Sequence, residues 1–240
     1  MRQYIAIFLL MSVLTMSVLA GTDNNVPVNL PANENAKIVT KENGFTRTDF
    51  LHYEKSSVAV SSVSGQCYSN FAEWSNTPVN YVINPSNPQR LSQLFVTTAI
   101  SNAIETWDVA TVRDLSNPYT IDYSATWGVN DGKNSIVFGR YISPGVIAVT
   151  GTWTNDATGE IVDSDILFNL NFKWGDATIK PQVMDLQNIA THELGHTIGL
   201  DDIYSSSCSD VTMYGYSSKG ETRKRTLETP DITVLNLLYP

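Results

Sequence analysis

The sequence predicts an α+β or α/β domain built on a mixed β-sheet. Several short runs of alternating apolar residues lie between two long stretches in which apolar residues recur every three or four positions, a pattern typical of strands between amphipathic helices. The chain has 240 residues, enough for one domain with a large hydrophobic core. Hydrophobic residues make up 42% of it and charged residues 16%, which excludes a wholly disordered protein.

The first twenty residues form the most apolar run of the chain. Arg2 gives it a positive start, residues 5–19 are almost uncharged, and Ala20 precedes Gly21. This pattern predicts a signal peptide over residues 1–20, cleaved near Ala20. The alternative is a retained membrane anchor, although the run is shorter than a spanning helix needs. We therefore expect a secreted or extracytoplasmic protein, with no stable membrane insertion after cleavage.

Residues 21–66 differ in composition from the rest, because they are rich in Asn, Ser, Thr and Lys. They are predicted to form a poorly packed leader or pro-segment with at most one short strand, and residues 67–240 the compact domain. Cys67 and Cys208 are the only cysteines, so export predicts a disulfide between them. In the alternative interpretation, Cys67 is a thiolate that blocks a metal until the leader is removed.

Within residues 67–240, periodicity predicts the order of the elements. An alternating run ending at residue 84 predicts a strand, and residues 90–112 predict a long amphipathic helix. Further strands are predicted over residues 119–124, 134–139, 145–154 and 162–170, followed by a helix over 185–198. A last helix is expected to begin with Thr229 as its N-cap and Pro230 in its first turn.

The net charge of −9 argues against nucleic acids and anionic membrane surfaces as partners. The basic run of residues 223–225 is interpreted as a solvated face. We expect a monomer.

A metal-binding pattern occurs at residues 192–202, which read HELGHTIGLDD. On a helix, His192 and His196 lie one turn apart on the same face, so both imidazoles can bind one Zn²⁺. Glu193 can hold a water molecule bound to the metal without itself being a ligand.

A third ligand requires the chain to turn sharply after the helix. Gly199 allows that turn because glycine tolerates positive φ angles. Asp202 follows three residues later and is the predicted third ligand, with Asp201 as the alternative. The remaining histidine, His52, is set aside because it lies in the leader.

Residues 192–202 resemble the extended zinc motif of the metzincin clan, HExxHxxGxx followed by His or Asp. An Asp in the last place resembles the snapalysin-like variants. Residues 74–84, 134–139 and 220–240 look similar to matrixin-like peptidases. The resemblance covers residues 67–240. It implies a mixed, mostly parallel twisted sheet with two long helices and a C-terminal helix, with the zinc site between an upper and a lower subdomain.

The same resemblance implies roles for several further residues. Residues 211–215 resemble the methionine turn, with Met213 beneath the zinc histidines. Residues 145–150 resemble the edge strand that aligns substrate, so Val146, Ile147 and Ala148 are candidate substrate-binding residues; an ordinary internal strand is the alternative. Tyr214 and Tyr216 are further candidates. Asp163 and Asp165 are expected to be solvated, with a structural Ca²⁺ site as the alternative.

Together these patterns predict an exported zinc endopeptidase that acts on peptide or protein substrates. Glu193 is expected to be the general base for a water molecule bound to the zinc. The alternative function is a catalytically weak or silent zinc-containing protein that binds peptides on the same scaffold. The presence of Glu193 favours the enzyme.

Overall fold

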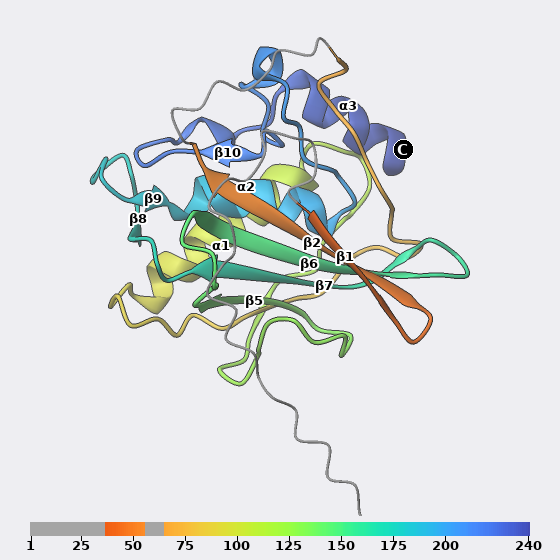
Figure 1. Ribbon diagram of the computed structural model, residues 1–240, viewed down its shortest axis with the longest axis horizontal. Coiled ribbons are helices and arrows are strands. Elements are labelled where there is room, and N and C mark those ends of the chain that lie inside the picture. Colours follow the sequence, from red (N-terminus) through yellow and green to blue (C-terminus); the bar gives the residue numbers. More distant parts are fainter. Residues whose placement is uncertain (1–36, 56–64) are drawn as a thin grey trace, which may run out of the picture. The chain divides into compact units, whose positions relative to one another are not determined.

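A mixed sheet of eight strands organises the part of the chain that the computed structural model describes, residues 37–55 and 65–240 (Figure 1). The predicted signal peptide lies outside the described residues. The strand order is β1-β2-β6-β7-β5-β3-β4, and β10 pairs with the end of β2. β6 is antiparallel to both of its neighbours, whereas β7, β5, β3 and β4 run parallel to one another. The predicted mixed sheet is confirmed.

The elements follow the predicted order, with shorter bounds at several ends. The strands are β1 (Lys37–Glu42), β2 (Phe45–Glu54), β3 (Tyr81–Ile83), β4 (Thr120–Ile121), β5 (Asn134–Gly139), β6 (Val146–Asn155), β7 (Ile161–Asn169), β8 (Trp174–Gly175), β9 (Met184–Asp185) and β10 (Tyr216–Ser217). The helices are α1 (Gln93–Asp108), α2 (Leu186–Thr197) and α3 (Thr229–Leu238), with short 3₁₀ turns η1 (Ser206–Cys208) and η2 (Arg223–Arg225).

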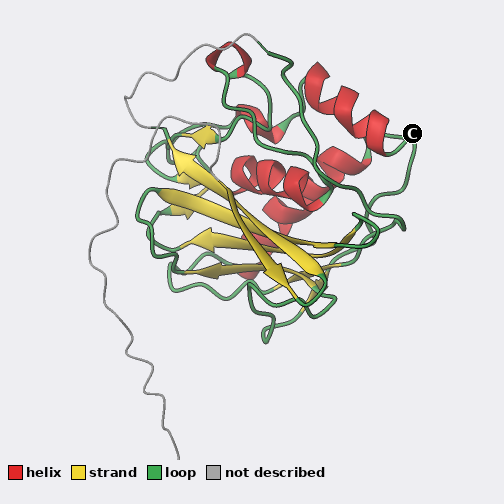
Figure 2. Ribbon diagram, turned by 45° about the vertical axis from the view of Figure 1, so that its right-hand side comes forward, coloured by secondary structure: helices red, strands yellow, loops and turns green. Residues whose placement is uncertain are grey.

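The helices lie against one face of the sheet (Figure 2). α2 packs on β6 and β7, and α1 packs on α2. α2 begins at Asp185, whose carboxylate accepts a hydrogen bond of 2.9 Å from the backbone N–H of Asn188. The N-cap of α3 is Glu228 and not the predicted Thr229, because the Asp231 carboxylate reaches back to the Glu228 N–H at 2.9 Å and closes a capping box.

The predicted leader contains a large, well-packed piece of the sheet. Residues 37–54 form the hairpin β1–β2, and β2 pairs with β6 from Phe45 to Tyr53. Phe50, Leu51 and His52 are all buried. The expectation of a poorly packed segment is therefore wrong for these residues, because β2 has a packed side chain on each face. As a consequence, β6 is an internal strand between β2 and β7 in this structure.

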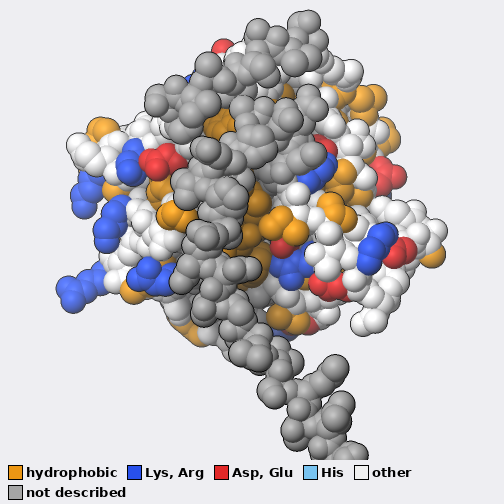
Figure 3. All heavy atoms as spheres, viewed as in Figure 1, with side chains coloured by type: hydrophobic (Ala, Val, Ile, Leu, Met, Phe, Trp, Pro, Cys, Tyr) orange, Lys and Arg blue, Asp and Glu red, His pale blue; other side chains and the backbone are white. Residues whose placement is uncertain are grey.

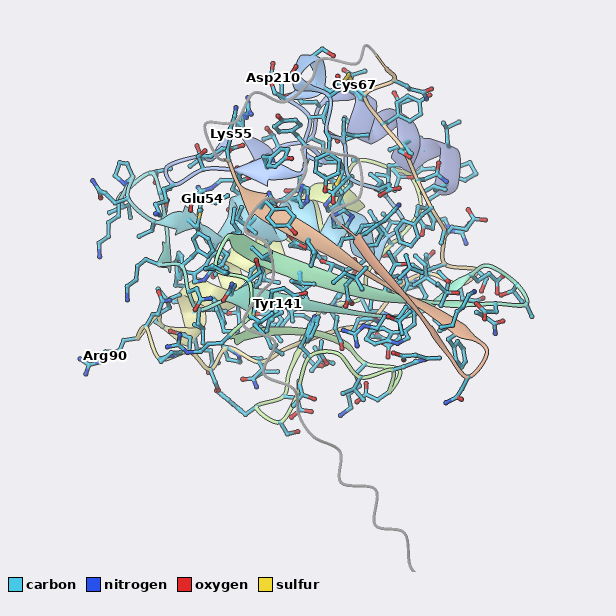
Figure 4. All side chains as sticks on the ribbon, viewed as in Figure 1. Glu54, Lys55, Cys67, Arg90, Tyr141 and Asp210 are labelled. Atoms are coloured by element: carbon cyan, nitrogen blue, oxygen red, sulfur yellow. A yellow bond between two sulfur atoms is a disulfide. The ribbon has the colours of Figure 1, made fainter. Side chains whose placement is uncertain are left out.

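Two further expectations can be compared with the packing. Cys67 and Cys208 form the predicted disulfide, which excludes a free Cys67 thiolate (Figure 4). Asp163 and Asp165 on β7 are fully buried, so their expected solvation is wrong. Their carboxylates accept backbone N–H groups of the preceding loop, among them Asp131 at 2.7 Å and Gly128 at 2.8 Å. These N–H groups already use carboxylate oxygens that a Ca²⁺ ion would need. The calcium site stays a prediction.

The turn after α2 depends on Gly199. Its φ angle is +97°, and a Cβ atom at this position would overlap the carbonyl oxygen of Ala72. The backbone of this turn continues into Asp202, so the position of that carboxylate depends on the glycine.

We expect Gly199→Ala to lower the free energy of unfolding by more than about 2 kcal/mol, because strain at positive φ adds to a clash with rigid backbone. Gly159→Ala is the matched control: its φ is +77°, but no atom lies within 4 Å of the added Cβ. Urea unfolding measures both variants. Equal losses would show that the close approach at Gly199 contributes nothing.

Candidate metal centre and active site

Helix α2 presents both predicted zinc histidines with their rings held in one orientation. The Nδ1–H of His192 donates to the carbonyl oxygen of Thr212 at 2.8 Å, and that of His196 to the carbonyl oxygen of Leu200 at 2.8 Å. In a neutral imidazole this leaves the lone pair on Nε2. A backbone carbonyl behind the ring is the usual way in which proteins orient a metal-binding histidine.

Asp202 completes a group of three acceptor atoms. Its Oδ1 lies 3.3 Å from Nε2 of His192 and 3.5 Å from Nε2 of His196. Within the described residues, all three atoms are buried and have no hydrogen-bond partner. Buried acceptors without a donor are rare and costly, and a cation would satisfy all three at once. Two imidazoles and one carboxylate also match the ligand set of a catalytic zinc, so these residues fit the metal.

The pKa values of His192 and Asp202 also suit a metal, whereas for His196 the Asp202 carboxylate outweighs burial and raises the pKa. Burial lowers the pKa of His192 to about 4, which keeps the ring neutral at pH 7. Burial alone would raise the pKa of Asp202, but His196 and His192 outweigh it and hold that pKa well below its usual range. An unprotonated imidazole and an ionised carboxylate are the states that bind metals.

The carboxylates of Asp202 and of the alternative ligand Asp201 point in different directions. The Asp201 carboxylate points to the leader, where Lys37 donates to it at 2.7 Å. Asp202 instead receives a hydrogen bond of 2.8 Å on Oδ2 from the hydroxyl of Tyr204, which leaves Oδ1 facing the histidines. Sequence reasoning missed Tyr204, because its role depends on the path of the turn.

Met213 lies directly beneath α2, as the resemblance implied. A Cβ atom on Gly195 would overlap its sulfur, so the helix and the methionine approach closely only because residue 195 is glycine. The turn is held from the C-terminal helix: the Asp231 carboxylate accepts the N–H groups of Thr212 at 2.9 Å and Met213 at 3.3 Å. The carbonyl that orients His192 belongs to the same turn.

Glu193 is fully buried beside the three acceptor atoms. Its Oε2 accepts a hydrogen bond of 2.6 Å from the hydroxyl of Thr150 on β6. Its Oε1 lies 2.9 Å from Nδ1 of His52. Burial raises the pKa of Glu193 to about 7, near the value that suits a group which must gain and lose a proton at neutral pH.

The leader strand β2 covers this centre. The ring of His52 packs on His192 with centroids 3.8 Å apart, and the ring of Phe50 stacks on His196 at 4.2 Å. All three histidines are buried, and none is visible on the face shown in Figure 3. A second group of potential metal ligands, His52, His192 and Glu193, shares a histidine with the first. The sequence signal for His52 was its spacing from Phe50, which places both side chains on one face of a strand.

The predicted substrate-binding residues lie at the start of β6, which pairs with β2, and at or just before β10. Val146 and Ala148 pair with Tyr53 and His52 of β2, and Ile147 is buried. Tyr216 packs its ring on Tyr204 at 5.4 Å, and Tyr214 is buried.

The matrixin model of peptidases matches residues 73–240. The chain belongs to the matrixin family. Matrixins are zinc metallopeptidases, and the family therefore supports a hydrolase that acts on peptides or proteins. A search of curated proteins finds no match. The snapalysin-type role of Asp202 stays a prediction.

The disulfide of this matrixin fits an extracellular protein. Within residues 37–55 and 65–240, no helix is long and apolar enough to cross a membrane.

The zinc group can be tested with a matched pair of variants. We expect Asp202→Ala to weaken zinc binding by more than about 100-fold, since loss of a ligand should exceed the 10- to 100-fold effect of losing an outer contact. Asp201→Ala should bind zinc like the wild type, because its carboxylate faces Lys37. Competition with a fluorescent zinc chelator gives both affinities. The reverse pattern would assign the third ligand to Asp201.

Proposed function

We propose that this matrixin is an exported zinc endopeptidase in which His192, His196 and Asp202 hold the metal and Glu193 is the general base. The observation that carries the proposal is the Glu193 carboxylate beside three buried, unpartnered acceptor atoms. Export rests on the apolar N-terminal run and on the disulfide. A bound zinc would supply a Lewis acid that polarises the peptide carbonyl and makes a water molecule more acidic.

The chain's own residues supply the remaining steps. Thr150 orients the Glu193 carboxylate through Oε2, so that the other oxygen accepts a proton from the attacking water. Glu193 then donates that proton to the departing amine. An extended peptide pairs with the β6 backbone at Val146 to Ala148, where the structure has β2, and is thereby aligned beside Glu193.

We further propose that residues 21–66 are a pro-segment that keeps the enzyme latent. β2 runs antiparallel to β6 and occupies the backbone that a substrate would use. Nδ1 of His52 forms a hydrogen bond with Oε1 of Glu193, and the ring of Phe50 stacks on His196. Activity therefore requires that β2 leave the sheet, which cleavage after residue 54 would permit.

Glu193→Gln should retain zinc but lose activity by a factor of about 100 to 10,000, the usual contribution of a general base. Glu105→Gln, on the exposed side of α1, is the control. Casein hydrolysis by the processed protein and its zinc content are measured together. Full activity in Glu193→Gln would assign the base elsewhere, and a zinc-loaded, correctly processed wild type without activity would favour the silent peptide-binding protein.

His52→Ala in the uncleaved chain should raise the rate of peptide hydrolysis at least about tenfold, because a lost hydrogen bond of about 1.4 kcal/mol is a factor of ten in opening β2. Ile38→Ala, on the exposed face of β1, should change nothing. N-terminal sequencing confirms that the leader is still attached. A wild-type chain that is fully active with residues 21–66 in place would refute latency.

A further inference from the structure

A buried lysine lies under the active site. Lys224, the middle residue of η2, is fully buried, so the expected solvated face is wrong at this residue. Its ammonium donates to the carbonyl oxygens of Tyr214 and Tyr216 and, at 3.0 Å, to the hydroxyl oxygen of Ser217. Within the described residues it forms no direct ion pair with a carboxylate, so its hydrogen bonds all go to these neutral oxygen atoms.

The lysine determines the direction of a hydrogen-bond chain that ends at Glu193. An ammonium only donates, so Ser217 accepts from Lys224 and its own proton is free to point toward Nε2 of His52, 3.0 Å away. The other nitrogen of His52 then carries a proton and donates to Glu193. His52 is the acceptor that satisfies the Ser217 hydroxyl.

We call the space that the His52 side chain fills, between Glu193 and Ser217 and next to Ala148, the His52 pocket. β10, which carries Ser217, runs parallel to the end of β2 and pairs with it at Tyr53 and Glu54 (Figure 4). A peptide that replaces β2 would therefore lie between β6 and β10 and place one side chain in this pocket.

We propose that Ser217 and Lys224 determine substrate specificity: the His52 pocket takes a substrate side chain that accepts a hydrogen bond from Ser217 and can donate one to Glu193, such as an imidazole or amide, and rejects an aliphatic one. This inference rests on the proposed peptidase function. An aliphatic side chain would leave the buried Ser217 hydroxyl without an acceptor for its proton. For this reason, a pocket that forms hydrogen bonds with a substrate side chain strongly rejects side chains that lack the bonding group.

The first experiment uses the full, zinc-loaded chain, in which the side chain of residue 52 already fills the His52 pocket. Hydrogen exchange of the backbone amides in residues 45–54 reports the opening of β2, with β7 as the internal reference. His52→Leu should exchange at least about tenfold faster than His52→Gln, whose amide oxygen can accept from Ser217. In a Ser217→Ala background, the ratio of the exchange rate of His52→Leu to that of His52→Gln should fall by about tenfold. Lys224→Met should lower this ratio as well.

Comparing the Leu-to-Gln ratio of exchange rates with and without the Ser217 hydroxyl separates the effect of Ser217 from that of Glu193. Only the part of the ratio that is lost in Ser217→Ala arises from Ser217. Equal exchange of the Leu and Gln variants would overturn the inference. So would a ratio that stays the same in Ser217→Ala, since the preference would then arise from Glu193 alone. Neither outcome depends on catalysis.

The second experiment tests substrates directly. His52→Gly empties the pocket in the full chain, and the variant is incubated with a mixed peptide pool whose cut ends are sequenced. We expect Gln and His to be enriched over Leu, Ile and Val at one position next to the cut, and the enrichment to disappear when Ser217→Ala is added. Cleavage without this enrichment would overturn the inference and leave the proposed function intact. An uncut pool would count against the proposed function, while the exchange experiment still decides the chemistry of the pocket.

Discussion

Three buried acceptor atoms that face one another are the feature on which this structure depends. Nε2 of His192, Nε2 of His196 and Oδ1 of Asp202 converge without a donor among the described residues. Burying such groups unpaired costs several kcal/mol, and a cation between them would remove that cost. The histidines donate hydrogen bonds to backbone carbonyls and Asp202 accepts one from Tyr204, which prevents these side chains from turning to other partners.

The convergence is held by segments far apart in the sequence. Asp231, at the start of α3, fixes the Thr212–Met213 backbone, and the Thr212 carbonyl fixes the ring of His192. Gly195 lets the methionine approach the helix, and Gly199 lets the chain turn toward Asp202. The C-terminal helix is therefore part of the support of the candidate metal centre, because Asp231 acts on His192 through the Thr212–Met213 backbone.

The sequence was most informative where the chemistry is local. His192, Glu193, His196 and Asp202 lie on one helix and the turn that follows, so their relative positions follow from helical spacing and one glycine. Ser217 and Lys224 were missed because their partners come from other elements, and Tyr204 because its role depends on the path of the turn after α2. Lys224 was misleading for a further reason: it lies between two arginines, and a 3₁₀ turn directs the middle side chain of the run inward. The polar composition around residues 45–54 led to the prediction of a poorly packed segment, although Phe50 and His52 alternate as buried residues of a strand do.

In the latency mechanism that we propose, the position of β2 explains how one groove excludes a peptide and, after cleavage of the leader, admits it. Its backbone pairing with β6 is available to any extended chain, so it cannot by itself favour the leader over a substrate. The leader has the advantage of being covalently attached, which gives it an effective concentration in the millimolar range. Cleavage removes that advantage at once, whereas the contacts of Phe50 and His52 are unchanged. What then decides between a released leader and an incoming substrate is the side chain beside Ser217, so the residue that keeps the enzyme latent and the residue that it prefers to bind must satisfy the same hydroxyl.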